Sequence, residues 1–267
     1  MDIKFFATTW GLEYLSFEEQ FKKISEAGYD GVETGRIKPD EINQVLELLE
    51  KYNLLLICQQ WTEGTTSGEH VESFKKQADI NVRLEPIAIN SHTGKDHFGT
   101  FSNLKILKAI KNYGKTTEVP IFHETHRGRF AFASHVTSEY LEIMPHLNLT
   151  ADLSHWCCVA ESYLEDQEQR LKTIFGNCRQ IHARIGNTQS PQVNDPQSPE
   201  WETERNTFLK WWKDIISLGN DTRGIFPITC EFGPWPYMPT APFTAEPMCS
   251  QWDANIFMKK WLKENLP

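Results

Sequence analysis

The chain has 267 residues, of which 39% are hydrophobic and 24% are charged, a composition typical of a globular protein rather than of a disordered or fibrous one. Its 36 acidic and 27 basic side chains give a formal net charge of -9. Because such a field repels phosphate backbones and anionic lipids, the charge argues against nucleic acid and membrane surfaces as partners. The sequence also contains no run of about eighteen apolar residues that would predict a membrane span.

The N-terminus and the cysteines predict a cytoplasmic protein. The start of the chain lacks the basic flank and apolar core of a secretory signal and has the pattern of a strand. The cysteines show no recurring spacing and no CxxC motif, so we expect reduced, mostly buried thiols rather than a disulfide framework or a thiolate metal site. They are Cys58, Cys157, Cys158, Cys178, Cys230 and Cys249.

Short apolar runs rich in strand-forming residues alternate with amphipathic stretches of helical period along the whole chain. This alternation is typical of repeated βα units around a parallel sheet. The predicted strands cover residues 3–9, 31–34, 54–59, 87–92, 121–126, 149–155, 180–185 and 228–232.

A predicted helix follows each strand. In the first, over 16–27, Phe17, Phe21 and Ile24 recur at helical spacing, Ser16 can cap the N-terminus, and Gly28 follows the C-terminus. A second helix begins after Pro39. The remaining predicted helices cover residues 70–83, 101–113, 137–145, 161–175, 203–217 and 251–264.

The sequence predicts a single domain over residues 1–267. No linker rich in Gly, Ser or Pro divides it, and its one long polar stretch, 186–200, falls between a strand and the following helix. Eight βα units can form an open sheet or a closed barrel. The first strand-to-helix turn carries neither GxGxxG nor a P-loop, which favours a single (β/α)8 barrel of the triosephosphate isomerase (TIM) type.

Ionisable side chains stand at the ends of the last four predicted strands, where barrel enzymes carry their catalytic groups. In chain order they are Glu124; Asp152 with His155; His182 with Arg184; and Glu231. Three carboxylates and an imidazole at one point repel one another and lose hydration unless a cation neutralises them. The pattern therefore predicts one divalent metal ion on Glu124, Asp152, His182 and Glu231. Such ligands suit Mn²⁺, Mg²⁺ or Co²⁺, with Zn²⁺ as a further option.

The same residue types could instead form buried salt bridges at the barrel rim without any metal. Arg184 could pair with one of the carboxylates or contact substrate, and His155 could be a core histidine bonded to a backbone carbonyl. These alternatives stay open at the level of the sequence.

Polar or aromatic residues also end the earlier strands. They are Trp10, Glu33, Gln59 with Trp61, and His92. Because sugar rings have apolar faces that stack on aromatic rings, Trp10 and Trp61 are candidate substrate platforms. His92 and Arg127 are candidate hydrogen-bond donors to a polar or phosphorylated substrate.

Six segments together resemble the xylose isomerase-like barrel superfamily of sugar phosphate isomerases and epimerases. They are FFATTWG near the start, GYDGVETG at 28–35, HETHRGR at 123–129, ADLSHW at 151–156, IHARIG at 181–186 and CEFGP at 230–234. The resemblance covers nearly the whole chain. One departure concerns the substrate-binding arginine of the epimerases, which lies several residues beyond the strand-seven histidine, whereas Arg184 follows His182 by two.

The resemblance implies that Glu124, Asp152, His182 and Glu231 match metal ligands and that His155 matches a residue that contacts substrate hydroxyls. In the ketose epimerase branch, the carboxylates matching Glu124 and Glu231 also exchange protons with the two faces of the substrate. The resemblance therefore implies a metal-dependent isomerase or epimerase of a sugar or sugar derivative. Its reaction would be proton abstraction next to a carbonyl through a metal-stabilised ene-diolate.

Three alternatives remain. A metal-dependent dehydratase of a polyol could use the same site. From other classes, the chain could be a non-catalytic carbohydrate-binding barrel or a nuclease like the superfamily's AP endonuclease, although the negative charge opposes the latter. We expect a small sugar or polyol as the partner and no nucleic acid or membrane. The oligomeric state stays open, with a homo-oligomer as one option.

Overall fold

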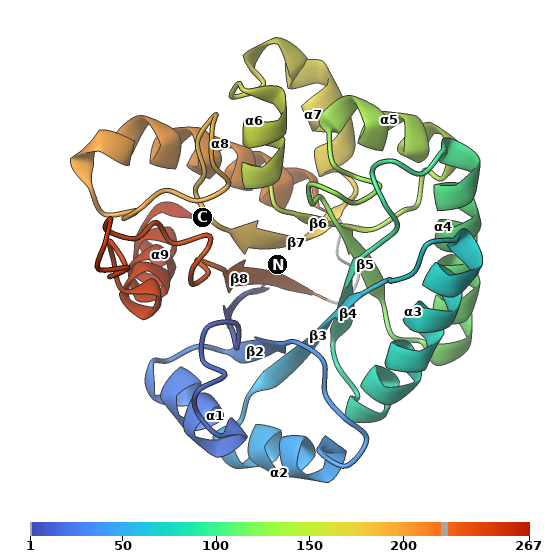
Figure 1. Ribbon diagram of the computed structural model, residues 1–267, viewed down its shortest axis with the longest axis horizontal. Coiled ribbons are helices and arrows are strands. Elements are labelled where there is room, and N and C mark those ends of the chain that lie inside the picture. Colours follow the sequence, from blue (N-terminus) through green and yellow to red (C-terminus); the bar gives the residue numbers. More distant parts are fainter. Residues whose placement is uncertain (1, 220–223) are drawn as a thin grey trace.

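Eight parallel strands close into a barrel in the computed structural model, which describes residues 2–219 and 224–267 (Figure 1). Each strand pairs with the next in chain order, and the first pairs with the last. The strands are β1 (Asp2–Thr8), β2 (Gly31–Thr34), β3 (Leu55–Trp61), β4 (Ala88–His92), β5 (Ile121–Glu124), β6 (Leu149–Ala151), β7 (Cys178–Ala183) and β8 (Ile225–Cys230). The (β/α)8 barrel predicted from the sequence is confirmed.

Helices surround the barrel (Figure 1). They are α1 (Phe17–Glu26), α2 (Ile42–Tyr52), α3 (Ser67–Asn81), α4 (Thr100–Thr117), α5 (Ser134–Ile143), α6 (Ser154–Ala160), α7 (Glu168–Phe175), α8 (Glu202–Leu218) and α9 (Gln251–Asn265). The predicted cap of α1 is present, because the Ser16 hydroxyl accepts from the Glu19 backbone N–H while the Glu19 carboxylate accepts from the Ser16 N–H. The side chains of Phe21 and Ile24 are buried on the inner face of this helix.

The region after β6 differs from the prediction in two ways. The strand predicted to reach residue 155 ends at Ala151, and His155 lies on α6 instead. The reason is local, since the Asp152 carboxylate accepts the Ser154 backbone N–H and so turns the chain out of the strand. The helix predicted over 161–175 also starts later than expected. Glu161 and Leu164 adopt left-handed backbone angles, with φ of 50° and 58°, so the chain after α6 leaves the α-helical conformation and α7 begins only at residue 168.

The strands differ in how far they pair. β1 and β8 are in register over six positions, from Asp2 opposite Ile225 to Ala7 opposite Cys230. β5 and β6 pair only where His123 lies opposite Leu149 and Glu124 opposite Thr150. The two ends of the chain are therefore held together over a longer ladder than its middle.

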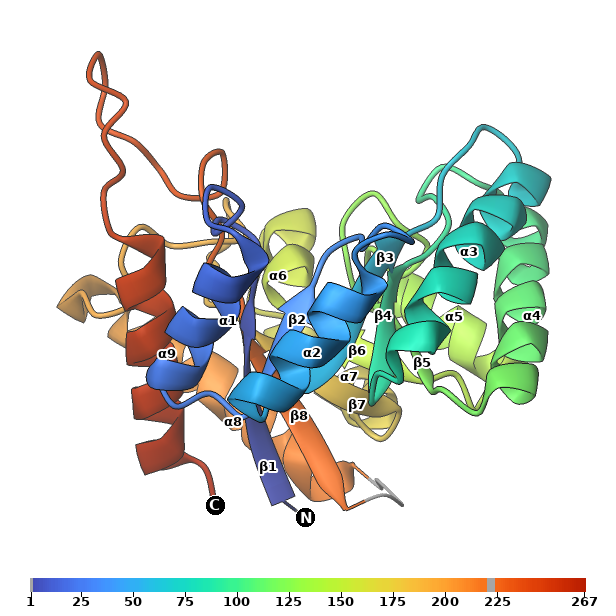
Figure 2. The same cartoon turned by 90° about the horizontal axis from the view of Figure 1, so that it is seen from below.

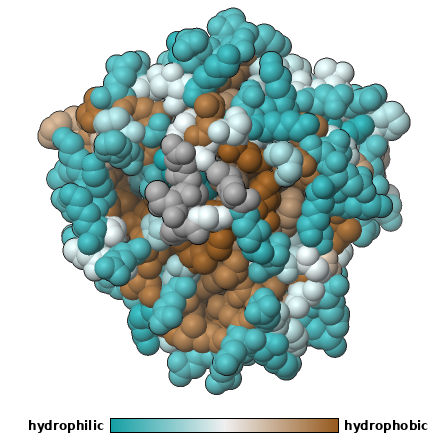
Figure 3. All heavy atoms as spheres, turned by 180° about the vertical axis from the view of Figure 1, so that it is seen from behind, coloured by the Kyte–Doolittle hydropathy of each residue, from teal (hydrophilic) through white to brown (hydrophobic). Residues whose placement is uncertain are grey.

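The two ends of the barrel have different surfaces. Beyond the carboxyl ends of the strands, the segment between β8 and α9 projects from the molecule, with a bridge between Thr240 and Pro247 (Figure 2). Apolar side chains gather near the middle of the opposite face (Figure 3). A hollow of about 430 Å³ there is lined by residues such as Val82 and Val119. No helix in the described part of the chain combines the length and apolar character needed to cross a bilayer.

Candidate metal centre and substrate cleft

The four predicted metal ligands meet at the carboxyl end of the barrel. Glu124, Asp152, His182 and Glu231 each offer a ligand atom, and these atoms all lie within 4.8 Å of one another. All four residues are buried. Glu124 ends β5, His182 lies near the end of β7, and Asp152 and Glu231 directly follow β6 and β8. Parallel strands bring these positions to the same end of the barrel, where the chemistry of (β/α)8 enzymes is found.

The orientation of His182 fits a metal ligand. Its Nε2 lies 3.1 Å from both carboxylate oxygens of Glu33, so this nitrogen can donate its hydrogen there. Its Nδ1 lies 2.8 Å from Glu231 Oε2 and 3.5 Å from Glu124 Oε2, without hydrogen-bonding geometry to either. A buried nitrogen lone pair that faces two carboxylates is the arrangement that a cation stabilises.

The pKa of His182 also indicates that positive charge is stabilised at this position. Burial alone lowers the pKa of this imidazole, but Glu231, Glu33 and Glu124 outweigh that effect and raise it well above its ordinary value. In the absence of a cation, a second proton on His182 would neutralise part of the cluster. A metal ion on Nδ1 would replace that proton, so metal binding would be accompanied by proton release.

Glu33 on β2 forms the layer behind His182. It is 1% exposed, and three neutral side chains donate to its carboxylate. They are Gln180 Nε2 at 2.7 Å, Thr229 Oγ1 at 2.5 Å and Asn90 Nδ2 at 3.1 Å. A carboxylate behind a metal-binding histidine fixes the ring and its tautomer. Sequence reasoning noted Glu33 as a polar strand end but assigned it no role, because its four partners come from three other strands.

Glu124 has a second group of imidazoles beside it. Its Oε2 accepts from Asn90 Nδ2 at 2.8 Å and lies 2.8 Å from His92 Nε2. Burial raises the pKa of Glu124, but His92 and His182 outweigh burial and bring it well below the ordinary value. His126, which the sequence analysis did not single out, lies with His92 and Glu124 in a second cluster of ligand atoms within 4.8 Å. Burial and then His92 lower the pKa of His126 to about 3, so its imidazole is neutral near pH 7.

Arg184 contacts two of the predicted ligands. Its Nη2 forms a short ion pair with Asp152 Oδ2 and lies 3.8 Å from Glu231 Oε2. The same nitrogen lies 3.0 Å from His155 Nε2. Burial raises the pKa of Asp152 to about 6 even though the guanidinium opposes the shift. Of the two roles that the sequence left open for Arg184, the structure shows the salt bridge, and the residue also lines the cleft described next.

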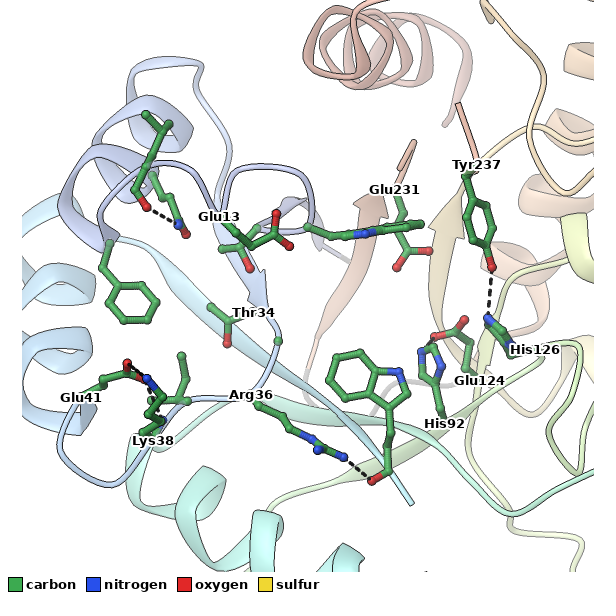
Figure 4. Close-up of a pocket in the computed structure, with 18 of the residues that line it drawn as sticks. Glu13, Thr34, Arg36, Lys38, Glu41, His92, Glu124, His126, Glu231 and Tyr237 are labelled. Atoms are coloured by element: carbon green, nitrogen blue, oxygen red, sulfur yellow. Dashed lines mark hydrogen bonds and ion pairs between the residues drawn. The ribbon is translucent and has the colours of Figure 1, made fainter. Parts of the chain in front are cut away.

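A cavity of about 830 Å³ opens above the cluster. Glu124 and Glu231 face it, and His92, His126 and Tyr237 lie beside Glu124 on the same side (Figure 4). Trp10 and Trp61, the predicted sugar platforms, also line it, and the Trp10 ring packs edge-on against Tyr237 with centroids 5.0 Å apart. Tyr237 was missed from sequence because it lies in a loop, six residues beyond Glu231.

Two predicted substrate-binding residues lie elsewhere. His155 is completely buried behind Arg184 and does not line the cavity. Arg127 is exposed, also outside the lining, with its guanidinium 5.3 Å from the centroid of the Tyr237 ring. The structure therefore places each of them next to a residue that lines the cavity, His155 beside Arg184 and Arg127 beside Tyr237.

The cysteines contribute no group to this site. Cys58, Cys157, Cys178 and Cys230 are buried, as the sequence predicted for most of the six. Burial raises the pKa of the Cys178 and Cys230 thiols to about 12, so both stay protonated near pH 7.

Comparison with known proteins places the fold. No family model matches the chain, and no curated protein sequence matches it. An L-ribulose 3-epimerase superimposes with a TM-score of 0.70 at 10% identity, covering 100% of this chain and 95% of that chain. A probable 3-DHS dehydratase of petrobactin synthesis from Bacillus anthracis gives 0.63 at 13% identity, covering 97% and 98%. An AP endonuclease of family 2 from Brucella melitensis gives 0.63 at 12% identity, covering 99% of each chain.

These similarities confirm, at the level of the fold, the resemblance to xylose isomerase-like barrels that the sequence predicted. The proteins that share the fold include an epimerase, a dehydratase and a nuclease. Because one fold carries such different reactions, the function of this chain must be argued from its site. The absence of a nucleic-acid partner stays a prediction from the net charge.

Proposed function

We propose that the chain is a metal-dependent isomerase or epimerase of a sugar or sugar derivative, built as one domain over residues 1–267. The observation that carries this proposal is the buried Nδ1 of His182, which faces two carboxylates at the floor of an open cleft. One divalent ion would be held by Glu124, Asp152, His182 and Glu231. It would stabilise negative charge that develops on the substrate oxygens.

Glu124 and Glu231 are the proposed proton-transfer groups, because both line the cleft while also belonging to the cluster. Neighbouring amides orient each of them. Gln59 Nε2 donates to Glu231 Oε1 at 3.2 Å, and Asn90 Nδ2 donates to Glu124 Oε2 at 2.8 Å. A carboxylate held in this way can remove a proton from the carbon next to a substrate carbonyl.

The fate of that proton decides the product. Its return to the opposite face of the same carbon gives the epimer, and its return to the adjacent carbon gives the aldose–ketose isomer. Arg184 lines the cleft next to Glu231, and its guanidinium can donate to a substrate oxygen beside this carboxylate. Trp10 and Trp61 supply apolar surface for the rest of the sugar.

The test is proton exchange in D₂O with the protein, Mn²⁺ and a panel of ketoses. We expect deuterium at a carbon next to the carbonyl without loss of water. Accumulation of an enone or keto product would instead assign the site to a dehydratase. Absence of both exchange and elimination for every sugar would contradict the proposal.

Metal content separates the other classes. Mass spectrometry should find about one divalent ion per chain after loading and dialysis. About three ions per chain would favour a nuclease, and failure to bind any ion would favour a carbohydrate-binding barrel.

A further inference from the structure

The cleft is larger than one sugar. At roughly 30 Å³ for each water-sized group, about 830 Å³ holds roughly 28 non-hydrogen atoms, whereas a hexose has about twelve. The cavity extends from Glu124 and Glu231 toward the loops before α1 and α2. Figure 4 shows Lys38 and Glu41 on the side away from Glu124, with Thr34 between them and the end lined by Glu124 and Glu231. We call this part the outer cleft and define it by Leu15, Phe17, Gln20, Thr34, Ile37 and Glu41.

Gln20 presents a fixed hydrogen-bond acceptor. Its side-chain nitrogen donates to the carbonyl oxygens of Leu12 and Leu15, at 3.1 and 2.9 Å, so both amide hydrogens are used. These two bonds determine which end of the amide is the oxygen. The residue is 5% exposed, and its Oε1 has no hydrogen-bond partner among the described residues. A buried acceptor of this kind favours a ligand that brings a donor.

Thr34 places a second buried polar group at the wall of the same cavity. It ends β2 and is 1% exposed, and its hydroxyl also has no hydrogen-bond partner in the described part of the chain. Leu15, Phe17 and Ile37 add apolar surface to the lining. An acceptor, a hydroxyl and an apolar wall together match a sugar ring, which has hydroxyl groups on its edge and C–H groups on its faces.

The charges at the outer cleft indicate a neutral occupant. Lys38 pairs with Glu41 at 3.3 Å, and Arg36 pairs with Glu63 at 2.8 Å. Both cations near the opening are therefore matched by carboxylates. A phosphate or carboxylate ligand would compete with Glu41 or Glu63 for these cations, whereas a neutral ring would not.

We propose that the outer cleft binds a second, uncharged sugar ring, so that the substrate is a disaccharide or a similar glycoside. Its reacting unit faces Glu124 and Glu231, and its second unit donates a hydroxyl hydrogen to Gln20 Oε1 and bonds Thr34. This inference rests on the proposed function for the identity of the reacting unit. It adds to that function a prediction of the size and charge of the whole substrate.

The experiment is calorimetric titration of the Mn²⁺-loaded protein with neutral disaccharides and their parts. The probes are the reducing disaccharides maltose, cellobiose and lactose, compared with glucose, galactose, fructose and glucose 6-phosphate. We expect at least one disaccharide to bind about tenfold more tightly than every monosaccharide and than the phosphate. Equal or weaker binding of all three disaccharides would overturn the inference.

Thr34→Val tests the outer cleft directly. Since the Thr34 hydroxyl has no partner in the described chain, its loss should leave the melting temperature unchanged. It should weaken the preferred disaccharide about tenfold and leave monosaccharide binding unchanged. Thr137→Val is the matched control. Thr137 is equally buried, but its hydroxyl bonds the Ala133 carbonyl on α5, so this variant should lose stability and keep the disaccharide affinity.

The two proposals fail in different ways. Proton exchange on ketoses without any preference for a disaccharide would remove the second ring and leave the proposed reaction intact. A disaccharide preference that Thr34→Val abolishes, with no exchange or elimination on any sugar, would keep the outer cleft and remove the reaction. An equal loss of disaccharide and monosaccharide binding in Thr34→Val would also contradict the inference.

Discussion

The two halves of the barrel contribute different chemistry to one cleft. The half from β5 to β8, green to orange in Figure 1, supplies Glu124, Asp152, His182 and Glu231. The half from β1 to β4, in blue to teal, supplies Glu33, Gln59 and Asn90 behind the cluster and Trp10, Thr34 and Trp61 along the cleft. One half offers groups that bind charge, and the other orients those groups and shapes the space for the substrate.

The largest effect should come from the charge-binding half. In Glu231→Gln the amide neither neutralises a cation nor accepts a proton near pH 7, so turnover should fall by at least about a hundredfold and metal affinity should fall with it. Steady-state kinetics and calorimetry measure the two losses. Glu246→Gln, an exposed change in the same loop, is the control and should be unaffected. Full activity of Glu231→Gln would place the chemistry outside this half.

Arg184→Met tests what the guanidinium of Arg184 contributes to the same half of the barrel. Removing the guanidinium leaves Asp152 buried without its ion pair, which should lower the free energy of unfolding of the metal-free protein by about 3–5 kcal/mol. Metal affinity should rise, because the cluster loses a competing positive charge. Urea unfolding and metal titration measure both changes. A drop in metal affinity would show that Arg184 positions the ligands rather than competes with the ion.

Glu33→Gln tests the orienting half. The Gln amide would bring its own hydrogens toward the donors of Gln180 and Thr229, so the carboxylate–imidazole contact should be lost. Metal affinity should fall about 10- to 100-fold. Nitrogen NMR of the His182 ring should also show a changed tautomer, a readout that loss of packing alone would not produce. Thr229→Val, which removes one donor to Glu33, should give a smaller change in the same direction.

The smallest effect concerns a contact between the halves that involves no metal. His123 Nδ1 on β5 lies 2.7 Å from the Thr93 hydroxyl beyond β4, and burial lowers the pKa of His123 to about 3. Because the unfolded chain takes up this proton near pH 6.5 and the folded chain does not, the stabilising contribution is complete above pH 6.5. It falls as the pH drops from 6.5 toward 3, by about 1.4 kcal/mol per pH unit.

The measurement is urea unfolding of the metal-free protein between pH 7 and pH 5. His123→Asn should reduce the pH dependence of the free energy of unfolding by that amount per unit. An unchanged slope in the variant would mean that His123 is protonated in the folded state, against its buried environment.

The same division explains what the sequence could predict. The strand order and the cluster of Glu124, Asp152, His182 and Glu231 were predictable because each member is an ionisable residue at the end of a strand, and the strands recur in order. Glu33 and Gln20 were not assigned roles, since those roles depend on partners from distant segments or on an acceptor left over after local bonds form. His155 was placed on a strand because the turn made by Asp152 is decided by a single side-chain bond to the Ser154 N–H.

The uneven strand pairing would give the proposed ion a structural role as well. Glu124 ends β5 and Asp152 follows β6, and these two strands pair at only two positions. The first and last strands, β1 and β8, instead pair along nearly all of β1. An ion shared by these two carboxylates would cross-link β5 and the segment after β6, the neighbouring strands with the shortest ladder in the barrel. Catalysis and closure of the barrel would then depend on the same bound ion. Its removal should first increase the hydrogen exchange of the backbone amides of β5 and β6 with solvent.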